Sequence, residues 1–184
     1  MICGGGKRLK VREIAEIGTG SNNTIDAVEN GKYPFYVRSQ DVKRIDRYEF
    51  DEESLLTSGD GVGVGKILHY VNGKYGLHQR AYRIHVIDNG VSTKYMFYYM
   101  QAFFEKYIVG NAVNSSVTSV RRRMLEKFTV SIPPLSEQER IVSILDKFDA
   151  LVNDSKISIQ AEIEARRKQY EYYRNKLLTF GEYA

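Results

Sequence analysis

Three segments of the sequence combine basic, amide, hydroxyl and aromatic side chains, the groups that contact nucleic acid. They are residues 36–44 (YVRSQDVKR), 74–80 (KYGLHQR) and 111–123 (NAVNSSVTSVRRR). Arginine can bind guanine through two hydrogen bonds and glutamine or asparagine can bind adenine, whereas lysine, serine and threonine hold phosphates. The candidates for base contact are Arg38, Gln40, His78, Gln79, Asn111 and Asn114. The candidates for phosphate contact are Lys66, Lys74, Arg80, Ser115, Arg121 and Arg122.

The charge of the chain favours the same kind of partner. The 184 residues include 27 Lys and Arg and 23 Asp and Glu, which gives a formal net charge of +4. Residues 1–135 carry 19 basic and 14 acidic side chains, a net +5, and residues 136–184 carry 8 and 9, a net −1. Each segment alone is also typical of a solvated loop or helix face. Together with the basic excess, which attracts a phosphate backbone, the three segments favour binding to DNA or RNA.

A glycine-rich stretch at residues 59–66 invites comparison with nucleotide-binding loops, but its spacing does not fit. A phosphate loop would need glycine at position 60 and a hydroxyl at position 67, where the chain has Asp60 and Ile67. A dinucleotide fingerprint would need glycine where Lys66 stands. The stretch is therefore interpreted as a tight turn that needs positive φ, and such a turn can also approach a DNA backbone closely. An enzyme that holds a nucleotide here stays an open alternative.

The remaining patterns predict no catalytic or metal site. The three histidines form no His-x-x-x-His pair, and the single cysteine, Cys3, cannot complete a zinc site with them. The sequence contains neither a Gly-x-Ser-x-Gly elbow nor a Glu-x-Lys nuclease motif. The Pro-Pro pair at 133–134 lacks the asparagine and the aromatic residue of an adenine methyltransferase loop. We therefore expect a binding protein that is not an enzyme and holds no cofactor or metal of its own.

Cysteine usage and hydropathy point to a cytoplasmic protein. A single cysteine excludes a disulfide framework and suits a reducing compartment. The apolar runs are too short to cross a membrane, and residues 1–7 contain no apolar signal-peptide core. We therefore expect neither a membrane span nor secretion.

Local patterns predict that residues 1–135 form a mixed α+β domain. Apolar spacing predicts helices, and alternating apolar runs predict strands. The expected helices are 11–17, 92–108 and 120–127. The expected strands are 33–37, one around 55–56, one that follows the glycine turn and ends at 71, 81–87 and 128–132. Asn72 with Gly73 is typical of a hairpin turn.

A proline pair separates this domain from a long helix. The prolines at 133–134 hold the chain extended, and the SEQE sequence at 136–139 is a capping box that begins a helix. Neither proline nor glycine interrupts residues 136–180. One helix over that range would be roughly 67 Å long. The expected domains are a nucleic-acid-binding domain at 1–135 and a helical region for dimerisation at 136–184.

Apolar side chains form a stripe along the predicted helix, at alternating spacings of three and four residues. The stripe fits a heptad repeat with one four-residue stutter near Ser155. It could pack on its own domain, but residues 1–135 are too few to cover so long a helix. We therefore expect a coiled coil with a second helix. The stripe consists of Ile141, Leu145, Phe148, Val152, Ile159, Ile163, Tyr170, Tyr173 and Leu177.

Two helix motifs resemble those of type I restriction–modification specificity subunits. Residues 132–146 (IPPLSEQERIVSILD) are similar to the junction that closes a target recognition domain and opens the conserved helix of that family. Residues 166–178 (RRKQYEYYRNKLL) are similar to the end of its central conserved region. Residues 34–42 (PFYVRSQDV) and the glycine turn at 61–66 match recurrent features of its recognition domains. The resemblance covers nearly the whole chain.

The resemblance implies a subunit that reads the sequence of double-stranded DNA and carries no catalytic centre. It further implies that residues 1–135 form the target recognition domain and that residues 136–184 serve for dimerisation and subunit docking. Such subunits dock modification subunits, which use S-adenosylmethionine to methylate adenine, and restriction subunits join the complex. A full-length member has two recognition domains and two long helices in an antiparallel coiled coil. This sequence stops at Ala184, about where a second recognition domain would begin. The chain is a natural half subunit, a truncated gene product or a fragment of a longer protein, and these three alternatives stay open. In each case we expect a homodimer on an interrupted inverted repeat. A stand-alone DNA-binding regulator that dimerises through the coiled coil is the alternative.

Overall fold

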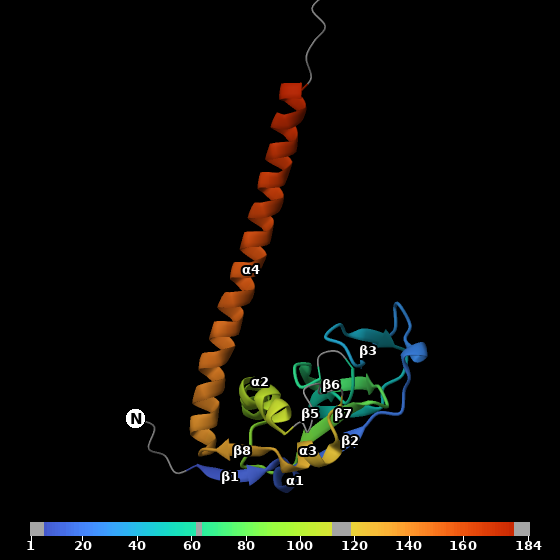
Figure 1. Cartoon of the computed structure of the whole chain (residues 1–184), viewed down its shortest axis with the longest axis vertical. Helices are drawn as coiled ribbons and strands as arrows, with labels where there is room; N and C mark the ends of the chain where they lie inside the picture. Colours follow the sequence, from blue (N-terminus) through green and yellow to red (C-terminus); the bar gives the residue numbers. More distant parts are fainter. Residues whose placement is uncertain (1–5, 62–63, 112–118, 179–184) are drawn as a thin grey trace, which may run out of the picture. The chain divides into compact units, whose positions relative to one another are not determined.

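The computed structural model describes residues 6–61, 64–111 and 119–178 (Figure 1). In the last helix, α4 (Leu135–Leu178), side chains are described for residues 135–152, 159 and 162–169. The chain divides into two compact units, Met1–Val142 and Ser143–Ala184. The sheets belong to the first unit, and the second unit contains α4 beyond Val142.

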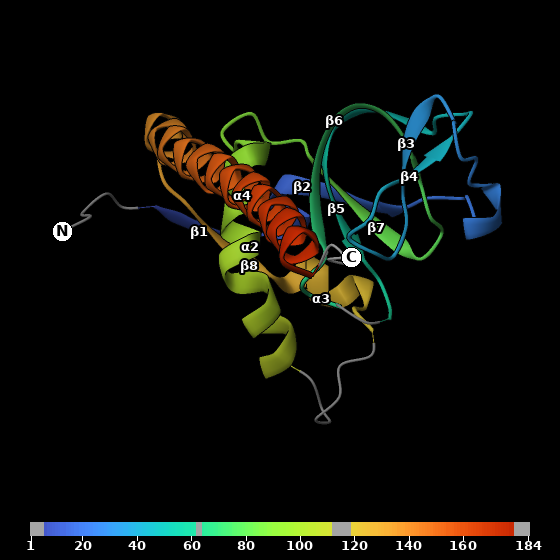
Figure 2. The same ribbon diagram turned by 90° about the horizontal axis from the view of Figure 1, so that it is seen from above.

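The first unit is built on a six-stranded sheet with the strand order β2-β7-β5-β6-β3-β4. Figure 2 shows its strands from above. Its neighbouring strands are antiparallel except β3 and β6, which are parallel. A separate two-stranded antiparallel sheet pairs β1 with β8. The strands are β1 (Lys7–Lys10), β2 (Ala15–Thr19), β3 (Tyr33–Tyr36), β4 (Lys43–Ile45), β5 (Phe50–Ser58), β6 (Leu68–Leu77), β7 (Ala81–Val86) and β8 (Thr129–Ile132). The other helices are α1 (Val11–Ile14), the 3-10 helix η1 (Thr24–Asp26), α2 (Thr93–Gly110) and α3 (Arg122–Lys127).

Helix α2 supplies one wall of the main core. Its apolar residues at four-residue spacing, Met96, Met100 and Phe104, are at most 1% exposed. They belong to the same buried cluster as Leu55 of β5 and Ile84 of β7. Burying each such side chain contributes about 1.5–3 kcal/mol relative to leaving it in water. The mixed α+β fold is therefore confirmed.

Two local predictions are wrong, each because tertiary pairing overrides the local signal. Asn72 and Gly73 do not form a hairpin turn but lie inside β6, where they pair with Glu53 and Glu52 of β5. Gly73 takes its positive φ of +113° within the strand. The helix predicted at 11–17 covers only Val11–Ile14, because the following residues form strand β2 and pair with β7.

The glycine-rich stretch contains the predicted positive-φ residues. Gly61 has φ +93° and Gly65 has φ +81°. A side chain at Gly61 would meet no atom within 4 Å, so backbone conformation and not crowding requires glycine there. The next strand, β6, begins at Leu68. The stretch therefore connects two strands of one sheet, unlike the strand-to-helix connection of a phosphate loop.

Helix α4 begins one residue earlier than predicted, directly after Pro134, which places Ser136 inside the first turn. The side chain of Gln138 is completely buried. Its Oε1 accepts a hydrogen bond from the Ser92 backbone N (2.8 Å). Its Nε2 donates to the carbonyl oxygens of Gly90 and Pro133, both at 2.8 Å. One carboxamide thus joins the first turn of α4 to the start of α2 and the end of β8.

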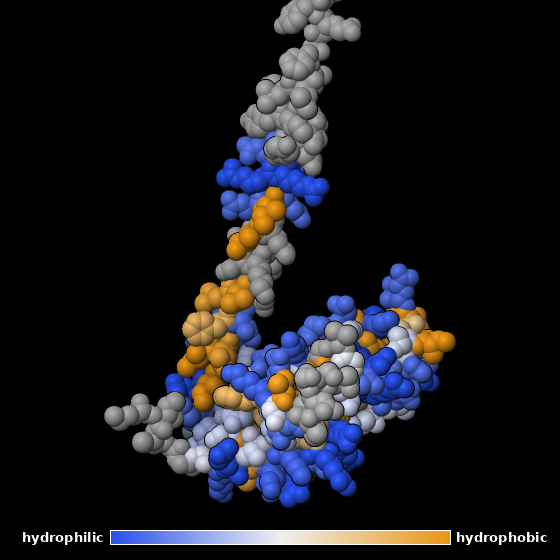
Figure 3. Space-filling model, viewed as in Figure 1, coloured by the Kyte–Doolittle hydropathy of each residue, from blue (hydrophilic) through white to orange (hydrophobic). Residues whose placement is uncertain are grey.

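The apolar stripe of α4 divides between two environments. Ile141 and Val142 are partly buried against the main core of the first unit, so for Ile141 the structure corrects the prediction of a partner contact. The side chains of Tyr170, Tyr173 and Leu177 lie outside those described. Leu145 is half-buried. Figure 3 shows apolar side chains along the described part of the helix. Beyond Val142, those that are 41–62% exposed are Ile144, Phe148, Leu151, Val152, Ile159 and Ile163.

Replacing Gln138 by alanine should strongly destabilise the first unit. Gln138→Ala removes three partly buried hydrogen bonds, so the free energy of unfolding should fall by about 3 kcal/mol. Urea titration followed by circular dichroism measures the change. Glu139→Ala, at the adjacent exposed position, should change it by less than about 0.5 kcal/mol. Equal effects of the two substitutions would contradict the role given to the carboxamide.

Candidate nucleic-acid interface

Asp60 joins two of the predicted arginines. Its Oδ1 accepts a hydrogen bond from Arg38 Nη1 (2.8 Å), and its Oδ2 accepts one from Arg80 Nη1 (3.3 Å). Three connections supply these residues, because Arg38 follows β3, Asp60 follows β5 and Arg80 lies between β6 and β7. A backbone bond from Gly59 N to Arg80 O (2.9 Å) joins the second and third connections, and one from Val120 N to Gly59 O (2.8 Å) adds the segment before α3. The order of strands in the sheet therefore creates this cluster.

Two open hollows border the cluster and meet at residues 59–61. The first has a volume of about 610 Å³, and its wall includes Arg38, Ser39, Gln40 and Lys43. The second has a volume of about 410 Å³, and its wall includes Gln79, Arg80, Arg121 and Arg122. Gly61 lines the first hollow, and Gly59 and Asp60 line the second. Half of the predicted DNA contacts thus gather on one continuous surface.

Besides His78, three other predicted contacts are described but line neither hollow. Lys66 forms an ion pair with Glu105 of α2 (3.4 Å). Lys74 forms one with an aspartate of β5 (3.9 Å), and its ammonium lies over the Tyr48 ring, 4.7 Å from the ring centroid. Asn111 follows α2, and its side-chain amide donates to a carbonyl of that helix. The structure does not bring these three residues to the cluster around Asp60.

His78 has a different position from the one predicted. Its side chain is only 2% exposed, and its Nδ1 accepts a hydrogen bond from the Arg80 backbone N (3.0 Å). Burial, reinforced by the charges of Arg38 and Arg80, lowers the pKa of His78, which keeps the ring neutral and able to accept this bond. The structure therefore corrects the prediction, because His78 positions the turn that carries Arg80 and does not reach a base. Asn114 and Ser115 lie outside the described residues.

A polar network that the sequence analysis missed supports this turn. Asn22 is 2% exposed, and its side-chain amide donates to Glu49 Oε2 (2.6 Å). Its Oδ1 accepts from Arg47 Nε (3.1 Å) and Nη2 (2.9 Å), while its backbone O accepts from Gln79 N (2.9 Å). Glu49 Oε2 also accepts from Leu77 N (3.3 Å). Asn22 and Glu49 are 27 residues apart, so no local motif could have identified them.

The pKa of Asp60 is lowered, chiefly because Arg38 donates a hydrogen bond to its carboxylate. The charges of Arg38 and Arg80 and the hydrogen bond from Arg80 add to this effect, against a smaller effect of burial. Asp60 is therefore ionised at neutral pH and offsets part of the positive charge of the two arginines. The side chains of Arg38 and Arg80 are still 39% and 62% exposed, so both guanidinium groups remain accessible to a ligand.

Glu52 of β5 and Arg83 of β7 form a shielded ion pair on the central sheet. Arg83 donates Nε and Nη2 to the Glu52 carboxylate at 2.6 and 2.9 Å, and both side chains are about 15% exposed (14% and 15%). Burial alone would raise the pKa of Glu52, but hydrogen bonds from Arg83, Ser54 and Tyr75 outweigh it and lower the pKa. The pair links neighbouring strands and does not line either hollow of the cluster.

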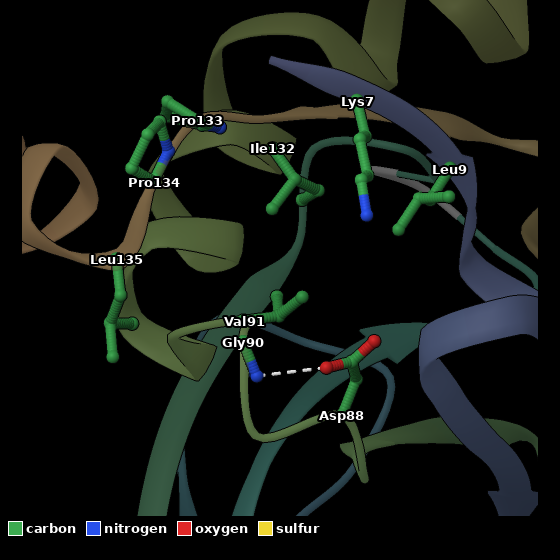
Figure 4. Close-up of a pocket in the computed structure, with 9 residues that line it drawn as sticks. All are labelled: Lys7, Leu9, Asp88, Gly90, Val91, Ile132, Pro133, Pro134 and Leu135. Atoms are coloured by element: carbon green, nitrogen blue, oxygen red, sulfur yellow. Dashed lines mark hydrogen bonds between the residues drawn. The ribbon is translucent and has the colours of Figure 1, made fainter.

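A further hollow lies beside the start of α4 (Figure 4). It has a volume of about 340 Å³, and its walls are mostly apolar, including Leu9, Val91 and residues 132–135. Figure 4 shows Lys7 and Asp88 entering it from opposite sides. None of the predicted DNA contacts lines this hollow, so it is not part of the candidate interface.

The protein-family model described as the type I restriction modification DNA specificity domain matches residues 7–165 of this chain. The chain belongs to this family. The match includes both hollows, the proline pair and much of α4. Among the described residues no group of three or more His, Cys, Asp and Glu could hold a metal ion. None of the described helices is long and apolar enough to span a membrane.

Curated proteins that are similar to this chain are named type I restriction enzyme specificity subunits. The MpnII specificity subunit of Mycoplasma pneumoniae is 29% identical over 178 residues, which cover 94% of this chain and 52% of the relative. The EcoR124I/EcoR124II specificity subunit of Escherichia coli is 49% identical over 65 residues, covering 35% of this chain and 16% of the relative. The chain therefore spans about half the length of the first relative.

Solved structures show the same fold. The S subunit from M. genitalium matches with a TM-score of 0.67 at 16% identity, covering 99% of this chain and 48% of the other. The HsdS subunit from Thermoanaerobacter tengcongensis matches with a TM-score of 0.65 at 19% identity, covering 93% and 44%. The specificity domain therefore has the same architecture as about half of each of these chains.

Acid should remove the stabilisation that Glu52 gives. Because its folded pKa lies below the ordinary 4.5, the contribution is complete above pH 4.5 and is lost as the pH falls through the folded value. Glu52→Gln should lower the free energy of unfolding by about 2 kcal/mol at pH 7 and by much less at pH 3. Glu16→Gln removes a carboxylate that is 62% exposed and 3.6 Å from Arg83, and should cost less than about 1 kcal/mol. Denaturant titrations at both pH values measure this, and a pH-independent loss at Glu52 would contradict the account.

Proposed function

We propose that this chain recognises DNA sequence as the specificity component of a type I restriction–modification complex. The family match over residues 7–165 carries the proposal. The gathering of basic and amide side chains at the two hollows supports it, because these groups suit the edges of base pairs and the phosphate backbone. Each chain would read one half-site.

The two hollows offer both kinds of contact that DNA recognition needs. The carboxamides of Gln40 and Gln79 match adenine, and the guanidinium groups of Arg38 and Arg80 match guanine. The exposed arginines at 121–122 suit phosphates, which fix the position of a protein on the duplex without reading sequence. We assign base contact to the first four residues and phosphate contact to the arginine pair.

We further propose that the chain has no catalytic centre and positions modification and restriction subunits. In this assembly the modification subunits bind S-adenosylmethionine and methylate adenine, and the restriction subunits carry the endonuclease. The alternative of a stand-alone regulator has no support from the family match or from the relatives named above. Nucleotide binding at residues 59–66 is disfavoured because this stretch joins two strands.

Helix α4 provides the proposed means of dimerisation. Phe148, Val152, Ile159 and Ile163 are 50–62% exposed, and the adjoining Ile144 and Leu151 widen the same stripe. An apolar stripe of this length is stabilised by pairing with another helix. Two antiparallel copies would hold one recognition unit at each end, so the DNA target would be an interrupted inverted repeat.

Selection from a randomised duplex pool tests sequence recognition by the full chain. The chain should enrich a two-part inverted repeat with a fixed spacer. Failure to enrich any sequence, alone and with the modification subunit present, would overturn the proposed function.

Arg80→Gln provides the matched test of residue assignment. It should cost about 1–3 kcal/mol at one base pair of each half-site and relax the preference there. Arg8→Gln removes the same charge at an exposed position that lines neither hollow, and should leave the selected sequence unchanged. If both substitutions relaxed the same base pair, charge alone would explain the effect.

Dimerisation should depend on the exposed stripe of α4. At micromolar concentration, light scattering should give a mass twice the 21.2 kDa of one chain. Phe148→Glu places a charge in the stripe and should shift the mass to that of a monomer. Ala150→Glu adds the same charge at an exposed position off the stripe and should leave the dimer intact. A monomeric parent chain would contradict the dimer.

A further inference from the structure

The backbone around Asp60 is fixed independently of its carboxylate. The hydroxyl of Ser58, a fully buried residue, donates to the Asp60 backbone O (2.6 Å). Asp60 also forms an isolated antiparallel bridge with Ser119, and the preceding residue, Gly59, bonds to the backbone of Arg80. The carboxylate therefore stands at a set place between the two hollows, and its removal leaves these backbone contacts in place.

The carboxylate holds each arginine by one edge only. Arg38 and Arg80 each use Nη1 for the bond to Asp60, at 2.8 and 3.3 Å. An arginine has five N–H donors, so the Nε and Nη2 hydrogens that make up the other edge of each group stay unused by Asp60. That edge has the fork geometry that pairs with guanine O6 and N7. Among the described residues, neither guanidinium has a second hydrogen-bond acceptor.

We infer that Asp60 is a positioning residue for sequence discrimination, which holds Arg38 and Arg80 in fixed orientations toward DNA. This inference rests on the proposed function of the chain. Asp60 acts through the two arginines and touches no base itself. With the carboxylate present, the DNA-facing surface has two donors in fixed orientations. Without it, the two arginines would repel each other and adopt several rotamers.

The same carboxylate disfavours binding to the wrong sequence. Non-specific binding depends mainly on phosphate neutralisation, for which free and mobile guanidinium groups are sufficient. A fixed negative charge between the two arginines weakens their attraction to phosphate. It leaves their free edges able to form hydrogen bonds with bases. Specificity often combines a favourable contact with such an unfavourable element. Asp60 should therefore raise the ratio of specific to non-specific affinity more than it changes specific affinity.

Asp60→Asn in the full chain tests this inference, with Asp46→Asn as the matched control. Asp46 is exposed and lines neither hollow, and its substitution makes the same change in net charge. The readout is the affinity for the selected duplex divided by the affinity for a scrambled duplex of equal length. Asp60→Asn should lower this ratio about tenfold or more, chiefly by tightening the scrambled complex. Asp46→Asn should change the ratio less than about twofold.

The same substitution in a chain that also carries Arg38→Gln and Arg80→Gln separates positioning from a structural effect. In that background Asp60→Asn should have no further effect on the ratio, because the residues through which it acts are gone. Provided that the parent chain discriminates between the two duplexes, three results would each overturn the inference. They are an undiminished effect in that background, equal ratios for the two aspartate substitutions, and an unchanged ratio for Asp60→Asn. A parent chain that binds both duplexes equally would overturn the proposed function and this inference with it.

Discussion

The buried carboxamide of Gln138 is the contact on which the organisation of this chain depends. A carboxamide out of reach of water must satisfy its donors and its acceptor within the protein, and this one binds backbone groups at Gly90, Ser92 and Pro133. The first turn of α4 can therefore begin only where β8 ends and the connection into α2 passes. The proline pair keeps the chain extended up to that point. The transition from recognition unit to helix is thus fixed by a few residues.

At the candidate interface, charged side chains likewise fix distant segments of the chain through hydrogen bonds. Loops that are distant in the sequence meet because the central strands β7, β5, β6 and β3 are neighbours. The satisfied network of Asn22 and Glu49 fixes the turn before Gln79, and Asp60 fixes the arginines on both sides of its own loop. A surface that must distinguish base pairs benefits from such fixed donors, because mobile ones lose conformational freedom on binding.

The features predicted correctly from the sequence are those with a local physical cause. Apolar spacing located α2 with Met96, Met100 and Phe104 in the core, and the proline pair located the start of α4 to within one residue. The arginines and glutamines that line the two hollows were chosen by residue type, and their contact with DNA stays a prediction. What could not be predicted depends on pairing over long distances, such as β1 with β8, and on burial, which withdraws His78 from the surface. In the sequence Asp60 is only the residue that breaks a phosphate-loop pattern, and its two arginine partners become visible only in the fold.

We propose that this chain reads one half of a DNA target together with a second copy, and that modification subunits carry out the methylation. Sequencing of methylated adenines in cells that express this chain with its modification subunit tests it most directly. The account predicts methylation at an interrupted inverted repeat that disappears when the chain is deleted. Methylation that persists without the chain, or that marks an asymmetric target, would contradict it.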